Sequence, residues 1–350
     1  KSHETRMDAE VFGTYIDRIK PVIQAGSSDS AALDAVFELM VRAGRSAPLV
    51  KNMLIPDAWS KRSTLTEQHK AFFSYCNCVI EPWDGPAAIV ATDGRWVVAG
   101  MDRNGLRPMR YTVMEDGLLL VGSETGMVHI DEAEVIEKGR IGPGQSLAVD
   151  LNEGRLYHDH ELKDMLAAAR PYGQWVANIT QLDDLIRSGV RERAEFDRDE
   201  LRRRQLGAGY TLEEIELLLQ PMVEDAKEAT GSMGDDTPTA VLSERYRGLH
   251  HFFRQAFSQV TNPPIDSLRE YRVMSLNTRL GNLGNILDED ESQTRLLQLE
   301  SPVLTNGQFE SMRDYMGDTV AEIDSTFPPA DGEGALRAAM DRSQAEAENA

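Results

Sequence analysis

Residues 78–108 read CVIEPWDGPAAIVATDGRWVVAGMDRNGLRP, and this stretch decides the fold class. Two apolar runs lie on either side of Asp93-Gly94, a residue pair that is common in two-residue hairpin turns. The stretch therefore predicts two antiparallel β-strands. The segments at its ends, EPWDGPA and DRNGLRP, carry more charge and more turn-forming residues than a hairpin requires. Both segments are therefore candidates for a functional role.

Short apolar segments continue after this hairpin as far as about residue 158. Asp116-Gly117 lies between two of these segments, and Asn152-Glu153-Gly154 lies between two others. Connections this short join neighbouring antiparallel strands. We therefore expect an antiparallel meander over residues 87–158, and we interpret KGRIGPG (138–144) as a turn before a strand. The expected strands contain AAIVAT, RWVVAGM, MRYTVM, LLLVGS, SLAVDL and RLYHD.

Helices are expected on the N-terminal side of the strands. Apolar residues recur at helical spacing over residues 4–20, and Pro21 ends this pattern. A second helix is expected over about residues 30–43. Thr64 and Glu67 have the spacing of a capping box for a third helix.

The composition changes near residue 180. Residues 181–205 are strongly charged and have a helical pattern, which indicates a solvated connecting helix. Thr211 and Glu214 are spaced to cap a further helix. The segment TVAEIDSTF (319–327) alternates like a strand, and a loop and a final helix follow it. Because such a unit is typical of α/β domains, we expect an α/β (α+β) chain.

Length and charge restrict the classes of protein to consider. At 350 residues the chain has the length of about two domains, which we place at 1–180 and 206–350, joined by residues 181–205. The net charge of -21 argues against a nucleic-acid partner, because phosphates attract clusters of Lys and Arg. No apolar run approaches the roughly 20 residues of a membrane span, so we expect no membrane partner. Two cysteines and no signal peptide predict a cytoplasmic location.

Both ends of the sequence indicate a longer protein. The sequence starts at Lys1 rather than Met. Its last segment, GALRAAMDRSQAEAENA, has a helical pattern with no turn signal to end it. We therefore expect that this chain is part of a longer polypeptide.

Few residues offer catalytic or metal-binding chemistry from the sequence alone. Cys76 and Cys78 are one residue apart, so on a helix they point in different directions and a structural role is favoured for both. His158 and His160 could present two imidazoles from one face of a strand, but no third metal ligand is evident near them in the sequence. We therefore expect no metal site.

Asp29 leaves two interpretations open. It lies in GSSDS, at the expected start of the second helix, where a carboxylate commonly caps the first turn. The same carboxylate could face a cleft and bind an ammonium group of a substrate. The two roles use different oxygen atoms, so they do not exclude each other.

Several long motifs resemble one protein family. GSSDSAALDAVFELMVRAGRS, MLIPDAW, EPWDGPAAIVATDGRWVVAGMDRNGLRPMRY and KGRIGPGQSLAVD resemble the later part of the class II, N-terminal-nucleophile glutamine amidotransferase domain of glutamate synthase large subunits. RRRQLGAGYTLEEIELLLQPM, GSMGDDTPTAVLS, FSQVTNPPIDSLREYRVMSL and SPVLTN resemble the start of their central domain. The resemblance spans nearly the whole chain. It implies the remainder of an αββα sandwich, followed by part of an α/β central domain.

The resemblance implies roles for residues of the first domain. Asp29 matches the carboxylate that receives the α-ammonium group of glutamine. No catalytic residue is implied, because the family's nucleophile is an N-terminal Cys and this sequence has no Cys before position 76. The hairpin ends match family signatures in the wall of the glutamine site, which implies wall positions for Asp84, Gly85, Arg103, Gly105 and Arg107.

In the second domain, TNPPI matches the segment that lines the family's ammonia passage. The match implies that Thr261, Asn262 and Ile265 line this passage. Small polar side chains beside an apolar one suit a passage that shields ammonia from water without binding it tightly. The segment could also be only a rigid connection, because two prolines follow Asn262.

The complete proteins of this family are enzymes, and the resemblance implies the same setting for this chain. They convert L-glutamine and 2-oxoglutarate into two glutamates, which assimilates ammonia. FMN and a 3Fe-4S cluster belong to the rest of the large subunit, and bacterial members add a small subunit with FAD, 4Fe-4S clusters and NADPH. We expect this chain to bind none of these cofactors, to contact the rest of the large subunit, and to be inactive alone because it lacks the nucleophile.

Two alternatives stay open at this point. Another class II amidotransferase, such as asparagine synthetase or amidophosphoribosyltransferase, would share the hairpin signature. A non-catalytic scaffold protein would account for the missing Cys. GSMGDDTP and TNPPID argue against the first alternative, because they do not belong to those acceptor domains. The open final helix argues against the second.

Overall fold

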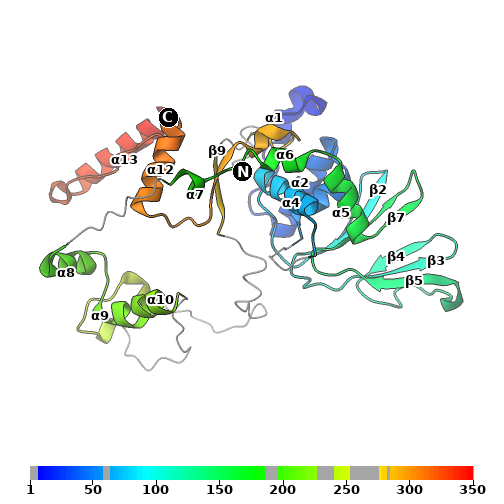
Figure 1. Cartoon of the computed structure of the whole chain (residues 1–350), viewed down its shortest axis with the longest axis horizontal. Coiled ribbons are helices and arrows are strands. Elements are labelled where there is room, and N and C mark those ends of the chain that lie inside the picture. Colours follow the sequence, from blue (N-terminus) through cyan, green and yellow to red (C-terminus); the bar gives the residue numbers. More distant parts are fainter. Residues whose placement is uncertain are drawn as a thin grey trace. The chain divides into compact units, whose positions relative to one another are not determined.

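The computed structural model describes residues 7–57, 64–186, 196–226, 240–252, 276–281 and 284–349. The chain forms two compact units: Lys1–Ser188 together with Asp266–Ala350, and Gly189–Ile265. Their helices and strands are shown in Figure 1. The structure is mixed α/β, as the sequence predicted.

Five helices and the first sheet contribute side chains to the main core of the larger unit. The helices are α2 (Asp29–Arg42), α3 (Ala47–Leu54), α4 (Glu67–Val79), α5 (Asp159–Ala168) and α6 (Tyr172–Val176). α4 packs against α5 and α6, while α3 packs against α2 and the sheet strand β2. The core side chains are apolar and include both aliphatic and aromatic residues, and Met40, Phe72, Phe73, Tyr75, Leu162 and Tyr172 are each at most 2% exposed. Burial of this apolar surface is what holds the helices on the sheet.

The first sheet confirms the predicted hairpin. β1 (Ala88–Thr92), β2 (Trp96–Met101), β6 (Ser146–Asp150) and β7 (Arg155–Tyr157) pair in the order β1-β2-β6-β7, and every pair is antiparallel. Val90 lies opposite Ala99, and Val98 lies opposite Ala148. β1 is an edge strand, and the hairpin brings EPWDGPA and DRNGLRP to the same end of the β1–β2 pair.

A second sheet contradicts the single meander expected over residues 87–158. β3 (Arg110–Met114) lies between β4 (Leu119–Gly122) and β5 (Val135–Arg140), and both pairs are antiparallel. The turn expected at 138–144 is therefore wrong for its first three residues, which belong to β5. β2 pairs with β6, 50 positions away in Val98↔Ala148, so the strands divide between two sheets. A small apolar cluster combines side chains from both: Ala99, Met101, Met109, Ile141 and Leu147.

A third, short sheet was not predicted. β10 (Leu296–Leu299) pairs in parallel with β8 (Thr180–Gln181) and antiparallel with β9 (Thr278–Gly281). α7 (Leu182–Leu185) and α12 (Asn306–Met316) pack beside it. Its core consists of Leu182, Leu297 and Leu299.

The C-terminal segment is partly as predicted. The final helix is α13 (Gly332–Asn349). The strand expected over 319–327 is wrong, because residues 320–327 belong to neither a strand nor a helix. Instead, Arg342 of α13 donates to the carbonyl oxygens of Asp324 (3.3 Å) and Thr326 (3.0 Å). The side chain of Arg342 therefore uses carbonyl groups that a strand would direct to a neighbouring strand.

Two N-terminal expectations need correction, and one helix was missed. Within the described part of 4–20 the helix is broken into a 3₁₀ helix, Glu10–Tyr15, and α1 (Ile16–Ile19), because Gly13 has a non-helical backbone. Thr66, not Thr64, caps α4, and its side chain accepts from the backbone N–H of His69 at 3.2 Å. α3 was missed. The helix expected over 30–43 is confirmed as α2.

The smaller unit contains α8 (Arg198–Gly207), α9 (Leu212–Glu214), a π-helical turn Ile215–Leu219 and α10 (Gln220–Asp225). The predicted capping box of α9 is confirmed, since Thr211 and Glu214 each accept from the other's backbone N–H. In residues 181–205, Gln181 belongs to β8, Leu182–Leu185 form α7, α8 begins at Arg198, and residues 187–195 lie outside the described residues. Single 3₁₀ turns occur in both units. Those of the smaller unit are Ala240–Leu242 and Leu249–Phe252, and those of the larger unit are Glu132–Glu134, Glu291–Thr294, Gly317–Thr319 and Pro329–Asp331.

Helices long and apolar enough to cross a membrane are absent from the described part of the chain.

Candidate functional site

Asp29 is the first residue of α2, but it is not the helix cap. The cap is Ser28, whose side chain accepts from the backbone N–H of Ala31 at 3.2 Å. The interpretation of Asp29 as an N-cap is therefore wrong by one residue. Asp29 is exposed, and its Oδ1 accepts only from the adjacent N–H of Ser30, at 2.8 Å. Its Oδ2 makes no hydrogen bond with a described residue, so it is accessible to a ligand.

Trp83 connects EPWDGPA to the start of α2. Its indole Nε1 donates to the backbone carbonyl oxygen of Asp29 at 3.1 Å, and its own N–H donates to the carbonyl oxygen of Leu54 at 2.7 Å. Gly85 lies beneath the indole ring, because a Cβ added to Gly85 would be 2.7 Å from a ring carbon of Trp83. A glycine is therefore required where the chain passes this ring.

The two ends of the hairpin lie next to each other. Arg103 of DRNGLRP lies 3.7 Å from the carboxylate of Asp84 in EPWDGPA, and Asp84 is 62% exposed. Ala87 and Asp102 also join the two ends. The N–H of Ala87 donates to Oδ1 of Asp102 at 3.2 Å, and the N–H of Asp102 donates to the carbonyl oxygen of Ala87 at 3.0 Å. The structure therefore brings together four of the predicted wall positions, Asp84, Gly85, Arg103 and Gly105, on one short surface.

Asp102 organises the DRNGLRP loop, and sequence reasoning missed it. Its side chain is 1% exposed and accepts backbone N–H groups of Ala87 (3.2 Å), Asn104 (3.0 Å) and Leu106 (3.1 Å). A buried carboxylate is stable when several donors surround it in this way. The Asp-x-Asn-Gly spacing, typical of turns closed by an aspartate side chain, is a signal that could have identified it.

Gly105 and Arg107 occupy very different surroundings. Gly105 has φ +66 and approaches Pro143, which a Cβ at Gly105 would meet at 2.6 Å. Arg107 is exposed and makes no hydrogen bond or ion pair with the described residues. Arg103 is mostly buried, and its Nε has no hydrogen-bond partner in the part of the chain that the structure describes. Arg103 and Gly105 therefore shape the surface, while Arg107 is open to solvent.

Lys51 supports the loop on which Gly105 packs. It is 1% exposed, and its Nζ donates to the carbonyl oxygens of Gly144 (3.0 Å), Ile55 (3.4 Å) and Gln145 (3.4 Å). The N–H of Gly144 in turn donates to the carbonyl oxygen of Asp102 at 2.8 Å. The pKa of Lys51 is lowered to about 7, mainly because a buried charge loses its hydration and secondarily because Lys163 lies nearby.

Lys163 forms a second buried contact of this region. Its Nζ lies 2.7 Å from carboxylate oxygens of both Asp57 and Asp159. The other oxygen of Asp159 accepts from the backbone N–H of Ser146, the first residue of β6, at 2.9 Å. This cluster fixes α5 to the sheet and to the chain after α3. Neither lysine was predicted to be buried.

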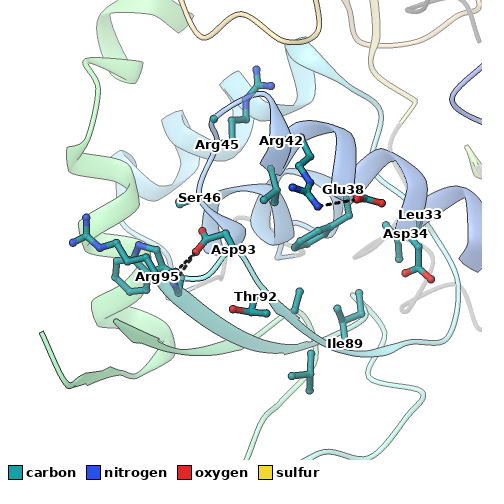
Figure 2. Close-up of a pocket in the computed structure, with 16 residues that line it drawn as sticks. Leu33, Asp34, Glu38, Arg42, Arg45, Ser46, Ile89, Thr92, Asp93 and Arg95 are labelled. Carbon is teal, nitrogen blue, oxygen red and sulfur yellow. Dashed lines mark hydrogen bonds and ion pairs between the residues drawn. The ribbon is translucent and has the colours of Figure 1, made fainter. Parts of the chain in front are cut away.

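A hollow of about 860 Å³ lies between α2 and β1. Figure 2 shows Asp34, Glu38 and Arg42 of α2 facing Ile89 and Thr92 of β1 across it. Glu38 and Arg42 are 3.5 Å apart in an ion pair. Neither Asp29 nor any predicted wall residue lines this hollow. The hollow is therefore separate from the surface described above.

Cys76 and Cys78 are both buried in α4. Burial raises the pKa of both thiols above their usual value, and Cys78 Sγ donates to the carbonyl oxygen of Ser74 at 3.2 Å. Because the thiolate is the nucleophilic form, neither side chain is suited to attack a substrate. Thr261, Asn262 and Ile265, the predicted passage residues, lie outside the described residues.

Comparison with known proteins gives two matches along the chain. The family described as glutamine amidotransferases class-II matches residues 1–175, and the glutamate synthase central domain matches residues 203–350. The chain belongs to the glutamate synthase large-chain family. The match to the central domain separates it from other class II amidotransferases. The fold is therefore that of an N-terminal-nucleophile amidotransferase domain followed by a glutamate synthase central domain.

Similar full-length proteins are much longer than this chain. The glutamate synthase [NADPH] large chain of Azospirillum brasilense is 65% identical over 352 residues, which cover 100% of this chain and 23% of the relative. The glutamate synthase [NADPH] large chain of Bacillus subtilis is 40% identical over 89% of this chain and 20% of its own length. The glutamate synthase [NADH] of Schizosaccharomyces pombe is 38% identical over 100% of this chain and 17% of its own length. The chain thus spans about a fifth of the length of these glutamate synthases.

Proposed function

We propose that this chain supplies part of the wall of the glutamine site in a cytoplasmic glutamate synthase large chain. The complete enzyme would convert L-glutamine and 2-oxoglutarate into two glutamates, using ammonia released from glutamine. The proposal is supported by the similarity to glutamate synthases over the whole chain. The 350-residue chain alone would be inactive, because its cysteines are buried and unsuited to nucleophilic attack.

The position of Asp29 is the observation that carries this proposal. Its carboxylate is exposed, it is not needed as a cap, and one of its oxygens is free of hydrogen bonds with described residues. Trp83 holds the backbone of Asp29 beside the EPWDGPA segment. An acceptor fixed in this way suits the α-ammonium group of glutamine, because a charge-assisted hydrogen bond to a carboxylate is among the stronger polar contacts.

The other predicted residues would act around this contact. Asp84, Gly85, Arg103 and Gly105 would shape the wall, and Arg107 would lie at its exposed end. Thr261, Asn262 and Ile265 would line the ammonia passage; the TNPPI resemblance supports this assignment. We propose domain borders near residues 180 and 205; the end of the first family match at residue 175 and the start of the second at residue 203 support this proposal.

Cofactors would be bound by other parts of the enzyme. A 3Fe-4S cluster is held by cysteine thiolates, and the two cysteines of this chain are too few and are both buried in α4. FMN and the cluster would therefore belong to the rest of the large chain. In a bacterial enzyme a small subunit would bring FAD, 4Fe-4S clusters and NADPH.

The substitution Asp29→Asn in the complete enzyme tests the role of Asp29. Loss of a carboxylate that pairs with an ammonium group removes about 2–4 kcal/mol of binding, so kcat/KM for glutamine should fall about 30-fold to 1000-fold. Glutaminase kinetics measure this effect. A thermal melt on the same variant shows whether the fold is retained.

Glu67→Gln is a matched control for this experiment. Glu67 occupies the same position in α4, directly after a hydroxyl cap, and is 88% exposed. Both substitutions remove an acid from the positive end of a helix, which costs about 0.3–1 kcal/mol. Glutamine kinetics should change only for Asp29→Asn. Equal, small effects of the two variants would assign Asp29 to helix stability alone.

A further inference from the structure

Three potential metal ligands come together between α4 and α5, away from the wall segments. His160 and Asp164 are four residues apart on α5 and therefore share one face of the helix. His69 lies in α4, which packs against α5. The donor atoms of the three side chains all lie within 4.8 Å of one another. Sequence reasoning considered His158 with His160 on a strand and found no third ligand, but His160 in fact lies on a helix.

Asp164 already contacts both imidazoles. Its Oδ1 lies 2.7 Å from Nε2 of His69, and its Oδ2 lies 3.0 Å from Nδ1 of His160. The two rings are edge to face, with centroids 5.0 Å apart. Partial burial would raise the pKa of the Asp164 carboxyl, but the hydrogen bond with His69 and the interaction with His160 lower it overall.

The three side chains differ in their freedom to move. The side chain of His69 is 0% exposed, and its other ring nitrogen, Nδ1, is buried without a hydrogen-bond partner among the described residues, so only Nε2 is available. His160 and Asp164 are 64% and 55% exposed. Donors around a tetrahedral zinc ion are about 3.3 Å apart, which follows from metal–ligand bonds of about 2.0–2.1 Å. Small rotations of the two exposed side chains would bring their donor atoms to this spacing.

We propose that His69, His160 and Asp164 form a site for one divalent transition-metal ion of the zinc class. Two imidazoles and one carboxylate are a donor set that Zn²⁺ and Co²⁺ prefer, whereas Mg²⁺ and Ca²⁺ prefer oxygen donors alone. The fourth coordination position would face solvent, because His160 and Asp164 are exposed. A bound ion would join α5 to α4 on the helical layer of the larger unit.

Metal titration of the purified protein tests this proposal. After treatment with a chelator and dialysis, the protein should bind Zn²⁺ with a stoichiometry of one in calorimetry. Co²⁺ should give the visible absorption of a four-coordinate site. Saturating Zn²⁺ should raise Tm by at least about 3 °C, because the ion binds the folded state alone.

Three variants assign the site. His160→Ala and Asp164→Asn alter exposed side chains, so both should fold, and both should weaken Zn²⁺ binding at least tenfold and remove the rise in Tm. His158→Ala is the control, because His158 is also exposed but lies 3.5 Å from Glu137, outside the cluster. It should bind Zn²⁺ like the parent protein.

The rival interpretation is a metal-free hydrogen-bonded group in which Asp164 joins the two histidines. It predicts that His160→Ala and Asp164→Asn lower Tm by the same amount with and without Zn²⁺. It also predicts no stoichiometric binding of Zn²⁺ to the parent protein. Either result, or binding that only His158→Ala removes, would overturn the proposal.

Discussion

The indole nitrogen of Trp83 donates a hydrogen bond to the backbone carbonyl oxygen of Asp29 at 3.1 Å, across 54 positions of sequence. The acceptor is the main chain, so Oδ2 of the Asp29 carboxylate stays accessible while the backbone is held. The position of the Trp83 ring explains why EPWDGPA has a tryptophan and, two residues later, a glycine. Trp83 reaches the start of α2, and Gly85 leaves space for its ring.

We predict that Trp83→Phe weakens glutamine use without unfolding the protein. The substitution keeps an aromatic ring over Gly85 and removes only one hydrogen bond, which contributes about 0.5–1.5 kcal/mol. In the complete enzyme the KM for glutamine should rise about 2-fold to 10-fold while kcat changes less. Trp175→Phe makes the same chemical change in α6 and should leave this KM unaltered. An unchanged KM in Trp83→Phe would mean that the contact does not position Asp29.

We predict that substitutions of the two neighbours Ser28 and Asp29 differ in their effect on stability. Ser28→Ala removes the N-cap of α2 and should lower the free energy of unfolding by about 1 kcal/mol. Asp29→Asn should change this free energy less, because only an interaction with the helix dipole is lost. Urea denaturation of both variants measures the difference. A larger destabilisation from Asp29→Asn would contradict the assignment of Ser28 as the cap.

We predict that two glycines with positive φ respond differently to alanine. Gly94 has φ +93 and nothing within 4 Å of the position that a Cβ would occupy, whereas a Cβ at Gly105 would be 2.6 Å from Pro143. Gly94→Ala therefore costs only backbone strain, about 1–2 kcal/mol. Gly105→Ala adds a steric clash and should cost about 1–3 kcal/mol more. Equal free energies of unfolding for the two variants would show that the Pro143 contact relaxes without cost.

We predict that Asp102→Ala is strongly destabilising. It leaves the part-buried backbone N–H groups of Ala87, Asn104 and Leu106 without the carboxylate that accepts from them. Unsatisfied buried donors cost about 1–3 kcal/mol each, and we expect a total loss of about 3 kcal/mol after relaxation. Asp116→Ala removes one exposed turn contact, to Leu118, and should cost less than about 1 kcal/mol. Similar losses from both variants in chemical denaturation would argue against this role of Asp102.

Features with a strong local signal were predictable from the sequence. The β1–β2 hairpin follows from apolar runs around Asp93-Gly94, and α2 follows from its helical periodicity. β5 was missed because its strand segment, VIEKGR, includes charged residues and a glycine, and only pairing with β3 identifies it. α3 was missed because seven of its eight residues are buried, so it shows no polar face.

The site depended on contacts that a local pattern does not contain. The exposed carboxylate at the start of α2 was predicted, although the cap was misplaced by one residue. Three contacts join residues far apart in sequence: the hydrogen bond from Trp83 to Asp29, the ion pair of Lys163 with Asp57, and the hydrogen bond from Lys51 to Gly144. A lysine normally indicates a surface position, so neither buried lysine could be identified without the fold.

We predict that Lys51 makes stability depend on pH between about 7 and 10.5. Burial lowers the pKa of Lys51 from 10.5 to about 7 in the folded state. Below pH 7 both states carry the proton, so the full cost of burying the charge is present. Between pH 7 and 10.5 only the unfolded state binds the proton, so the contribution of Lys51 to stability improves as pH rises, with a slope of up to about 1.4 kcal/mol per pH unit.

The variant Lys51→Met isolates this contribution. Methionine has a similar length but no charge, although it leaves the carbonyl oxygen of Gly144 without its donor, a loss that does not depend on pH. The free energy of unfolding of the variant minus that of the parent protein should therefore fall by about 2 kcal/mol from pH 7 to pH 9. Lys138→Met, at a 40% exposed lysine, provides the baseline for removing a lysine charge. Urea denaturation across this range measures both differences, and a flat profile for Lys51→Met would show that Lys51 keeps its proton throughout.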